Sequence, residues 1–223
     1  MRGRPVVTID GPSGAGKSTV STRLARAAGM VRLDTGAMYR ACALAARRSG
    51  VPWGDGRRLG ELARSMEISF RSPSGVPGVF LSGEEVTEAI RAPEISMGAS
   101  EVSAHLPVRE ALVAKQRELG RDGGVVLEGR DTGTVVFPDA EVKFFLDAAA
   151  AVRALRRYLE LRPGGGQSYE EVLTDVLRRD VADSTREHSP LKVADGAVYV
   201  DSTTLSVDEV VERMLSRLPK APR

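Results

Sequence analysis

Short apolar runs rich in β-branched residues recur along the chain and predict buried strands. Five such runs stand out: Pro5–Asp10, Met30–Asp34, Val125–Gly129, Glu141–Asp147 and Ala197–Asp201. Segments with helical periodicity separate them. Alternating strands and helices indicate an α/β fold, in which a parallel sheet is covered by helices on both faces.

Two segments interrupt this alternation. Residues 66–90 contain two strand-like runs joined by a link rich in Ser, Pro and Gly, which predicts an antiparallel insert on the parallel core. Three consecutive glycines lie between two helical segments at 162–168, where they fit either a lid or a plain surface connection. From the chain length we expect one compact unit with these small excursions.

The last predicted helix has a clear start signal. Ser206 is followed three residues later by Glu209, which is the spacing of a capping box. Apolar positions with helical spacing follow it: Val207, Val210, Val211 and Leu215. These features predict an amphipathic helix that packs on the sheet.

Residues 11–18 read GPSGAGKS and match the phosphate-loop pattern G-x-x-x-x-G-K-S/T at every fixed position. A predicted strand precedes this run and a predicted helix follows it, an arrangement that points backbone N–H groups at an anion. Lys17 would reach the β- and γ-phosphates, and the Ser18 hydroxyl would ligate Mg²⁺. We therefore predict a nucleoside triphosphate site formed by Gly11, Pro12, Ser13, Gly14, Ala15, Gly16, Lys17, Ser18 and Thr19.

Composition narrows the class of protein. The 223 residues are 42% hydrophobic and carry a net charge of +2, and the apolar runs are too short to cross a membrane. Cys42 is the only cysteine, which excludes a disulfide framework and a thiolate metal cluster. The few residues before the first strand leave no room for a signal peptide. We expect a soluble, cytoplasmic protein, a monomer without membrane or nucleic-acid partners.

A kinase with a phosphorylated acceptor needs a second group of cations opposite the loop. Arg40 and Arg130 lie in predicted strand-end turns, and Arg109 stands on a helical stretch. Taken singly, each also fits a surface arginine of little energetic weight. Candidates for a cationic lid flank the glycine-rich segment: Arg153, Arg156 and Arg157.

The stretch 178–186 offers a further charged group. If it is helical, Arg179, Asp183 and Arg186 fall in one narrow stripe. Such a stripe fits either phosphate binding or a solvent-exposed ladder of salt bridges. A lid with these arginines would compensate charge on a reacting phosphoryl group and exclude water.

Taken together, these segments resemble the bacterial-type cytidylate (CMP) kinases, within the nucleoside monophosphate kinase group. The resemblance covers nearly the whole chain and rests on residues 9–18, 33–40 and 129–140, followed in family order by Arg179–Asp180, Asp183, Arg186, Pro190–Leu191 and 201–203. It implies an α/β P-loop kinase with a five-stranded parallel sheet flanked by helices, a small monophosphate-binding insert and a short lid. It also implies a domain division: a core of 1–34, 98–152 and 171–223, a monophosphate-binding domain of 35–97, and a lid of 153–170.

The resemblance implies a role for each matching position. The phosphate of CMP or dCMP would be held by Thr35, Arg40 and Arg130. The cytosine base would be recognised by Ser100, Arg109 and Asp131, and the ribose by Arg179 and Asp183. The groups acting on the phosphoryl group transferred from Mg²⁺-ATP would be Lys17, Arg130, Arg157 and Arg186, with Arg153 close by.

Three alternatives fit the sequence less well. A kinase for UMP, AMP or a non-nucleotide metabolite does not account for the motif at 129–140. A GTP-dependent switch reads its base with an Asn-Lys-x-Asp motif, and this chain contains no asparagine. A nucleic-acid binder lacks support because aromatic residues make up 4% of the chain and no base-stacking module is visible.

Overall fold

The computed structural model describes residues 2–71, 78–162 and 166–219. The centre of the predicted lid loop, residues 163–165, and the link of the predicted insert, residues 72–77, lie outside the described residues.

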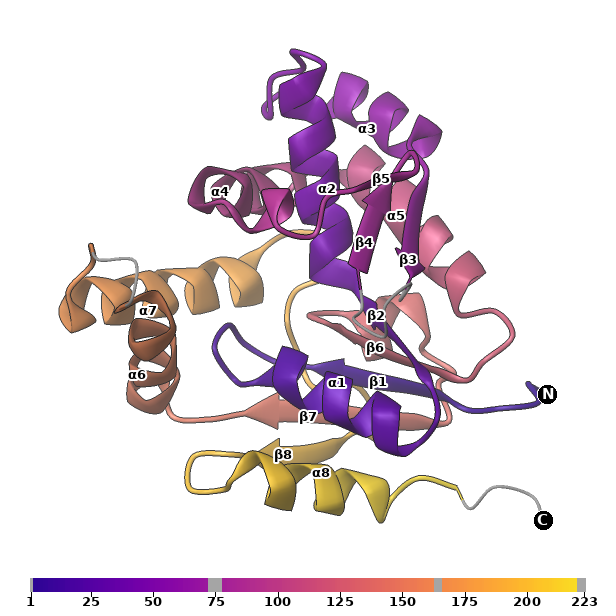
Figure 1. The fold of residues 1–223 in the computed structure, drawn as a ribbon, viewed down its shortest axis with the longest axis vertical. Coiled ribbons are helices and arrows are strands. Elements are labelled where there is room, and N and C mark those ends of the chain that lie inside the picture. The colour runs from indigo at the N-terminus through magenta and orange to yellow at the C-terminus, as the bar shows by residue number, and fades with distance from the viewer. Residues whose placement is uncertain (1, 72–77, 163–165, 220–223) are drawn as a thin grey trace. The chain divides into compact units, whose positions relative to one another are not determined.

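The chain divides into two compact units instead of the single unit that we expected (Figure 1). Unit 1 comprises residues 1–32 and 120–223, and unit 2 comprises residues 33–119. The reason is that unit 2 has a hydrophobic core of its own. Residues 98–119, which the resemblance assigned to the catalytic core, belong to unit 2 by their contacts.

A five-stranded parallel sheet has the order β2-β6-β1-β7-β8. Its strands lie in unit 1, except that the last two residues of β2 are counted with unit 2. The predicted strands are confirmed to within one residue at each end: β1 (Val6–Asp10), β2 (Val31–Asp34), β6 (Val125–Gly129), β7 (Val142–Asp147) and β8 (Val198–Asp201). Every residue of β1 and β6 is buried, as expected for central parallel strands. The register pairs Asp10 with Gly129, so the loops that follow β1 and β6 leave the same edge of the sheet.

Helices α1 (Lys17–Ala27) and α8 (Val207–Leu215) pack together beside the sheet of unit 1. Leu24 and Met214 from these helices share a buried cluster with Ile9 and Phe144 of the strands. A second pair, α6 (Ala150–Leu161) and α7 (Tyr169–Thr185), has a small apolar cluster around Ala154, Val172 and Val176 (Figure 1). After β6 the chain forms a short π-helical turn, Thr132–Val136.

Unit 2 consists of four helices and a small antiparallel sheet. Its helices are α2 (Thr35–Arg48), α3 (Gly56–Ser65), α4 (Pro93–Val102) and α5 (Leu106–Leu119), with a 3-10 turn at Ala89–Arg91. The predicted antiparallel insert is a three-stranded sheet of β3 (Ile68–Arg71), β4 (Gly78–Leu81) and β5 (Glu84–Glu85). Its core includes Met38, Cys42, Leu59, Ile95 and Leu112, none more than 1% exposed.

Side chains fix several helix starts. Ser206 and Glu209 form the predicted capping box of α8, and Ser168 and Glu171 form another at the start of α7. Asp34 caps α2 by accepting a hydrogen bond from the backbone N–H of Ala37 at 2.8 Å. None of the described helices combines the length and apolar character needed to cross a bilayer.

Gly98 of α4 provides a test of the packing in unit 2. A Cβ at Gly98 would lie 2.4 Å from the Trp53 ring, whose Nε1 donates to the carbonyl oxygen of Ala43. We expect Gly98→Ala to lower the free energy of unfolding by about 1–3 kcal/mol, because the core has no room for a methyl group. Urea denaturation followed by circular dichroism measures the change.

Gly54→Ala is the matched control, since a Cβ at Gly54 would meet nothing within 4 Å. We expect this variant to unfold at nearly the same urea concentration as the unchanged protein. Equal midpoints for both variants would contradict the close contact between α4 and the indole ring.

Candidate active site

The loop between β1 and α1 requires glycine at three places. A Cβ at Gly11 would lie 1.9 Å from the carbonyl oxygen of Leu146. Gly14 has φ +76° and packs on the backbone of Arg153, and Gly16 has φ +89°. L-residues with a side chain rarely adopt such angles, so these positions have a local conformational reason for glycine.

The N-terminus of α1 is electrostatically suited to an anion. Gly16 precedes the helix without a side-chain cap, and no acidic residue lies in the first turn. The first backbone N–H groups of a helix have no partner within it, and the helix dipole adds positive potential there. Ser18 and Thr19 in this turn are exposed. The loop and the first turn of α1 together can therefore bind phosphate oxygens.

Lys17 is buried beneath this loop. Its Nζ donates hydrogen bonds to the carbonyl oxygens of Gly11 at 2.7 Å and Pro12 at 2.6 Å. Burial, and next the positive charge of Arg130, lower the pKa of Lys17 to about 7, against the opposing effect of nearby carboxylates such as Glu128. A bound anion would stabilise the protonated form of Lys17 and so raise its pKa.

Further cations of unit 1 lie near Lys17. The pKa of Arg179 is lowered by burial and then by the positive charges of Arg157 and Arg130. Since like charges repel in a partly buried setting, their assembly at one place is unfavourable unless anions compensate it. A clustered set of cations beside a phosphate loop favours binding of a polyphosphate.

Four residues of unit 1 that we predicted to bind the acceptor substrate form two ion pairs. Arg130 Nε donates to the Asp183 carboxylate at 2.6 Å. Arg186 Nη2 lies 3.8 Å from the buried carboxylate of Asp131, and Arg186 Nε donates to the carbonyl oxygen of Ser189 at 2.6 Å. These contacts bring four of the predicted residues into two neighbouring pairs.

One sequence prediction about this region is wrong. Helix α7 ends at Thr185, and Arg186 follows it with φ −60° and ψ 143°, an extended conformation. Arg186 therefore does not continue the helical stripe of Arg179 and Asp183. The change of direction at Arg186 is what allows its guanidinium to lie near Asp131.

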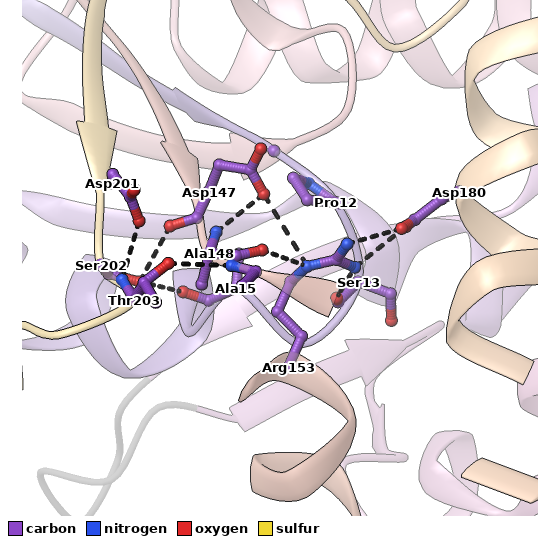
Figure 2. A network of polar contacts seen from close by, with 12 residues as sticks. Pro12, Ser13, Ala15, Asp147, Ala148, Arg153, Asp180, Asp201, Ser202 and Thr203 are labelled. Carbon is purple, nitrogen blue, oxygen red and sulfur yellow. Dashed lines mark hydrogen bonds and ion pairs between the residues drawn. The ribbon is translucent and has the colours of Figure 1, made fainter. Parts of the chain in front are cut away.

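The three arginines of α6 have different environments, which their helical spacing did not reveal. Arg153 is 5% exposed, and its guanidinium bonds Ala148, Ser13 and Asp180, as Figure 2 shows. Arg156 donates to both oxygens of Ser202. Arg157 is half exposed and pairs with Glu160. The donors of the Arg153 guanidinium are thus engaged by groups of the protein itself.

The predicted residues of unit 2 lie on three helices. Thr35 is buried in the first turn of α2, and Arg40, one turn later, donates to the Asp34 carboxylate at 3.1 Å. Arg109 of α5 is buried, with its guanidinium 5.7 Å from the centre of the Tyr39 ring. The remaining predicted residue, Ser100 of α4, is exposed.

Asp10 is a residue of the site that the sequence analysis missed. Its carboxylate is 2% exposed and accepts hydrogen bonds from the backbone N–H of Thr132 at 2.8 Å and of Gly133 at 2.7 Å. Burial raises the pKa of Asp10, while these hydrogen bonds act in the opposite direction. The carboxylate thus fixes the turn that directly follows Asp131. The available signal was a charged residue at the end of an otherwise uncharged, buried strand.

Comparison with known proteins places the chain among phosphotransferases. Residues 7–220 match the family model described as cytidylate kinase. A cytidylate kinase of Syntrophotalea carbinolica is 52% identical over 216 residues, which cover 96% of this chain and 92% of the relative. A cytidylate kinase of Geobacter sulfurreducens is 52% identical over 212 residues, covering 95% and 91%. A gluconokinase structure from Sinorhizobium meliloti 1021 is 18% identical, with a TM-score of 0.48 and coverage of 97% and 92%. From the family model and the two close relatives, the chain belongs to the cytidylate kinase family.

Proposed function

We propose that this chain transfers the γ-phosphoryl group of ATP to CMP, and also to dCMP, giving ADP and the corresponding diphosphate. The observation that carries the proposal is the group of buried and partly buried cations beside the phosphate loop. Burial, and next the charges of neighbouring arginines, lower the pKa values of Lys17 and Arg179. Phosphate groups of a donor and an acceptor supply the missing negative charge. The names of the close relatives support the choice of CMP as acceptor.

On the donor side, we assign the triphosphate to the loop from Gly11 to Gly16 and to the first turn of α1. Backbone N–H groups bind phosphate oxygens there without moving, and Lys17 adds a charge on a flexible stem. This assignment is supported by the glycine conformations and by the exposed hydroxyls of Ser18 and Thr19.

We propose Mg²⁺ as the cofactor, held by phosphate oxygens of ATP and by the hydroxyl of Ser18. The described residues include no group of three or more His, Cys, Asp or Glu side chains that could hold a metal ion. This fits an ion that arrives with the nucleotide and takes few protein ligands. When bound, the ion neutralises charge on the phosphate oxygens during transfer.

On the acceptor side, we assign the phosphate of CMP to Thr35, Arg40 and Arg130, and the ribose to Arg179 and Asp183. We assign the base to Asp131, Arg109 and Ser100. Cytosine offers an amino donor at N4 beside acceptors at N3 and O2, which a carboxylate and two donor groups complement. Uracil carries an acceptor at O4 and a donor at N3, so it would leave buried polar groups of this site unpaired.

The attacking group is an oxygen of the acceptor phosphate, which is already an anion. No general base is therefore needed, and the protein acts by positioning and by stabilising charge. We assign these roles to Lys17, Arg130, Arg157 and Arg186. As the oxygen of CMP bonds to the γ-phosphorus, the bond to the β,γ-bridging oxygen breaks and ADP leaves.

The domain division that the resemblance implies is also a proposal. As a division by role, residues 1–34, 98–152 and 171–223 would form the catalytic core, 35–97 the monophosphate-binding domain and 153–170 the lid. By contacts, residues 98–119 belong to unit 2. We propose further that the protein works as a monomer in the cytoplasm, without membrane or nucleic-acid partners. The single cysteine, Cys42, which is buried, is consistent with a reducing compartment.

The proposed reaction is tested by coupling ADP release to a spectrophotometric readout, with Mg²⁺-ATP and one of CMP, dCMP, UMP or AMP. We expect fast turnover with CMP and dCMP and slow turnover with UMP and AMP. Comparable rates with UMP would reject the base assignment, whereas ADP release that is independent of any acceptor would reject the kinase proposal.

Base recognition is tested by Asp131→Asn, which keeps the size of the side chain but offers an amide donor. We expect the ratio of kcat/KM for CMP to that for UMP to fall at least about tenfold, because an amide can donate to O4 of uracil. Asp139→Asn is the matched control, since Asp139 is an exposed carboxylate paired with Arg2. A ratio that is the same in both variants would contradict the role of Asp131.

The lowered pKa of Lys17 predicts that ATP binding depends on pH. Lys17 with a pKa of about 7 is mostly neutral at pH 8.5, so it must take up a proton when the triphosphate binds. We expect the Kd for ATP to rise with pH above 7, by up to about tenfold per pH unit. Calorimetry in two buffers of different ionisation enthalpy measures the proton uptake.

Lys17→Arg separates this effect from the titration of ATP itself, because an arginine keeps its charge over the whole range. We expect the variant to show less proton uptake at pH 8.5 than the unchanged protein and the same uptake at pH 6. If the variant and the unchanged protein take up the same number of protons at pH 8.5 as well as at pH 6, Lys17 does not titrate on binding.

A further inference from the structure

The carbonyl groups of the phosphate loop all require donors. A loop that points its N–H groups at an anion turns its carbonyls elsewhere, and buried carbonyls without partners are costly. Lys17 donates to the first two carbonyls of the loop. The carbonyl of Ser13 accepts from Arg153 Nη1 at 3.0 Å, and that of Ala15 from the Ser202 hydroxyl at 3.5 Å. Of these two hydrogen bonds from later parts of the chain, the one from Arg153 is the shorter.

The guanidinium of Arg153 is engaged on several sides. Its Nε donates to the carbonyl oxygen of Ala148 at 2.7 Å, at the point where β7 has ended. Nη1 and Nη2 bond the two carboxylate oxygens of Asp180 at 3.0 and 2.6 Å, a two-point pair that fixes the plane of the group. Figure 2 shows the guanidinium between Ser13 and Asp180.

The backbone of Arg153 contacts the loop as well. A Cβ at Gly14 would lie 3.0 Å from the carbonyl oxygen of Arg153 and 3.1 Å from its Cβ. The first turn of α6 thus packs directly on Gly14 while its arginine bonds the neighbouring Ser13. Two adjacent residues of the loop are held by one residue of α6.

Asp180 stabilises the buried charge that makes this contact possible. An arginine that is 5% exposed needs carboxylates to compensate its charge. Asp180 is the nearer of two such groups, since Asp147 Oδ1 lies 3.8 Å from Arg153 Nε (Figure 2). Asp183, one turn later on α7, pairs instead with Arg130 on the proposed acceptor side. Asp180 and Asp183 therefore support different parts of unit 1.

We propose that Arg153, held in place by Asp180, is a positioning residue that fixes the phosphate loop for the triphosphate. It acts through the carbonyl of Ser13 and does not contact the transferring phosphoryl group. This inference rests on the proposed function for the identity of the nucleotide. Its consequence is selective: loss of the pair weakens the donor site and leaves the acceptor site intact.

The test compares Arg153→Lys, which keeps the charge but loses the planar fork, with Asp180→Asn and the double variant. Calorimetry gives the Kd for Mg²⁺-ATP and, separately, for CMP. We expect each single change to weaken ATP binding by about 10- to 100-fold, and the double change to weaken it no further, because the two residues act as one unit. The Kd for CMP should change less than twofold.

Arg178→Lys and Asp175→Asn are matched controls, because they alter an exposed ion pair on α7, the helix that carries Asp180. Equal weakening of ATP and CMP binding would overturn the proposal in favour of general structural support. Losses that add up in the double variant would also overturn it, since they would mean that Arg153 and Asp180 affect ATP binding independently of each other.

Two further measurements keep the test decisive. Thermal unfolding establishes whether each variant is folded at the assay temperature. If a variant is not folded, Asp180→Glu replaces it, because this change keeps the charge and displaces it by one methylene. We expect Asp180→Glu to weaken ATP binding selectively as well, and unchanged binding would count against the proposal. Because ATP binding is measured without turnover, a protein that binds ATP but does not phosphorylate CMP would reject the proposed function alone.

Discussion

Repulsion between cations in a partly buried space is the constraint around which unit 1 is organised. Burial disfavours the charged forms of Lys17 and Arg179, and the charge of Arg130 adds to this effect on both, so that both pKa values are lowered. Carboxylates oppose this effect. Asp183 pairs with Arg130, and Glu128, Asp10 and Asp183 act to raise the pKa of Lys17. The pKa of Lys17 is nevertheless lowered to about 7, so a bound phosphate group would stabilise its charged form.

The parallel sheet explains why these groups meet. Strands β1 and β6 are paired in register from Val6 and Val125 onward, so Asp10 and Gly129 end at the same level. The phosphate loop follows Asp10, and Arg130 follows Gly129. Ligands of open α/β sheets bind outside the carboxyl ends of the strands for this topological reason. The buried β-branched residues of these strands thus place two loops that are 122 residues apart in the chain within hydrogen-bond distance.

Unit 2 is stabilised separately from this charged edge. Its core of Met38, Cys42, Leu59, Ile95 and Leu112 contains no charged side chain. Around it, the helices carry Thr35, Arg40 and Arg109, and the last of these is buried against the Tyr39 ring. The Arg109 guanidinium also donates to the carbonyl oxygen of Ser103 at 3.3 Å.

Local patterns determined much of the fold. The five strands, the capping box at Ser206 and the glycine loop follow from residues that are adjacent or one turn apart, and the structure confirms them. The fold class followed from the same patterns, while the long motif at 129–140 also indicated the family. Only the tertiary structure decided which charged side chains meet. Arg153 bonds Ser13, which is 140 residues away, and Asp10 bonds Thr132, which is 122 residues away. Helical spacing made Arg153 and Arg157 look equivalent, because periodicity records the face of a helix and not the partners packed against it.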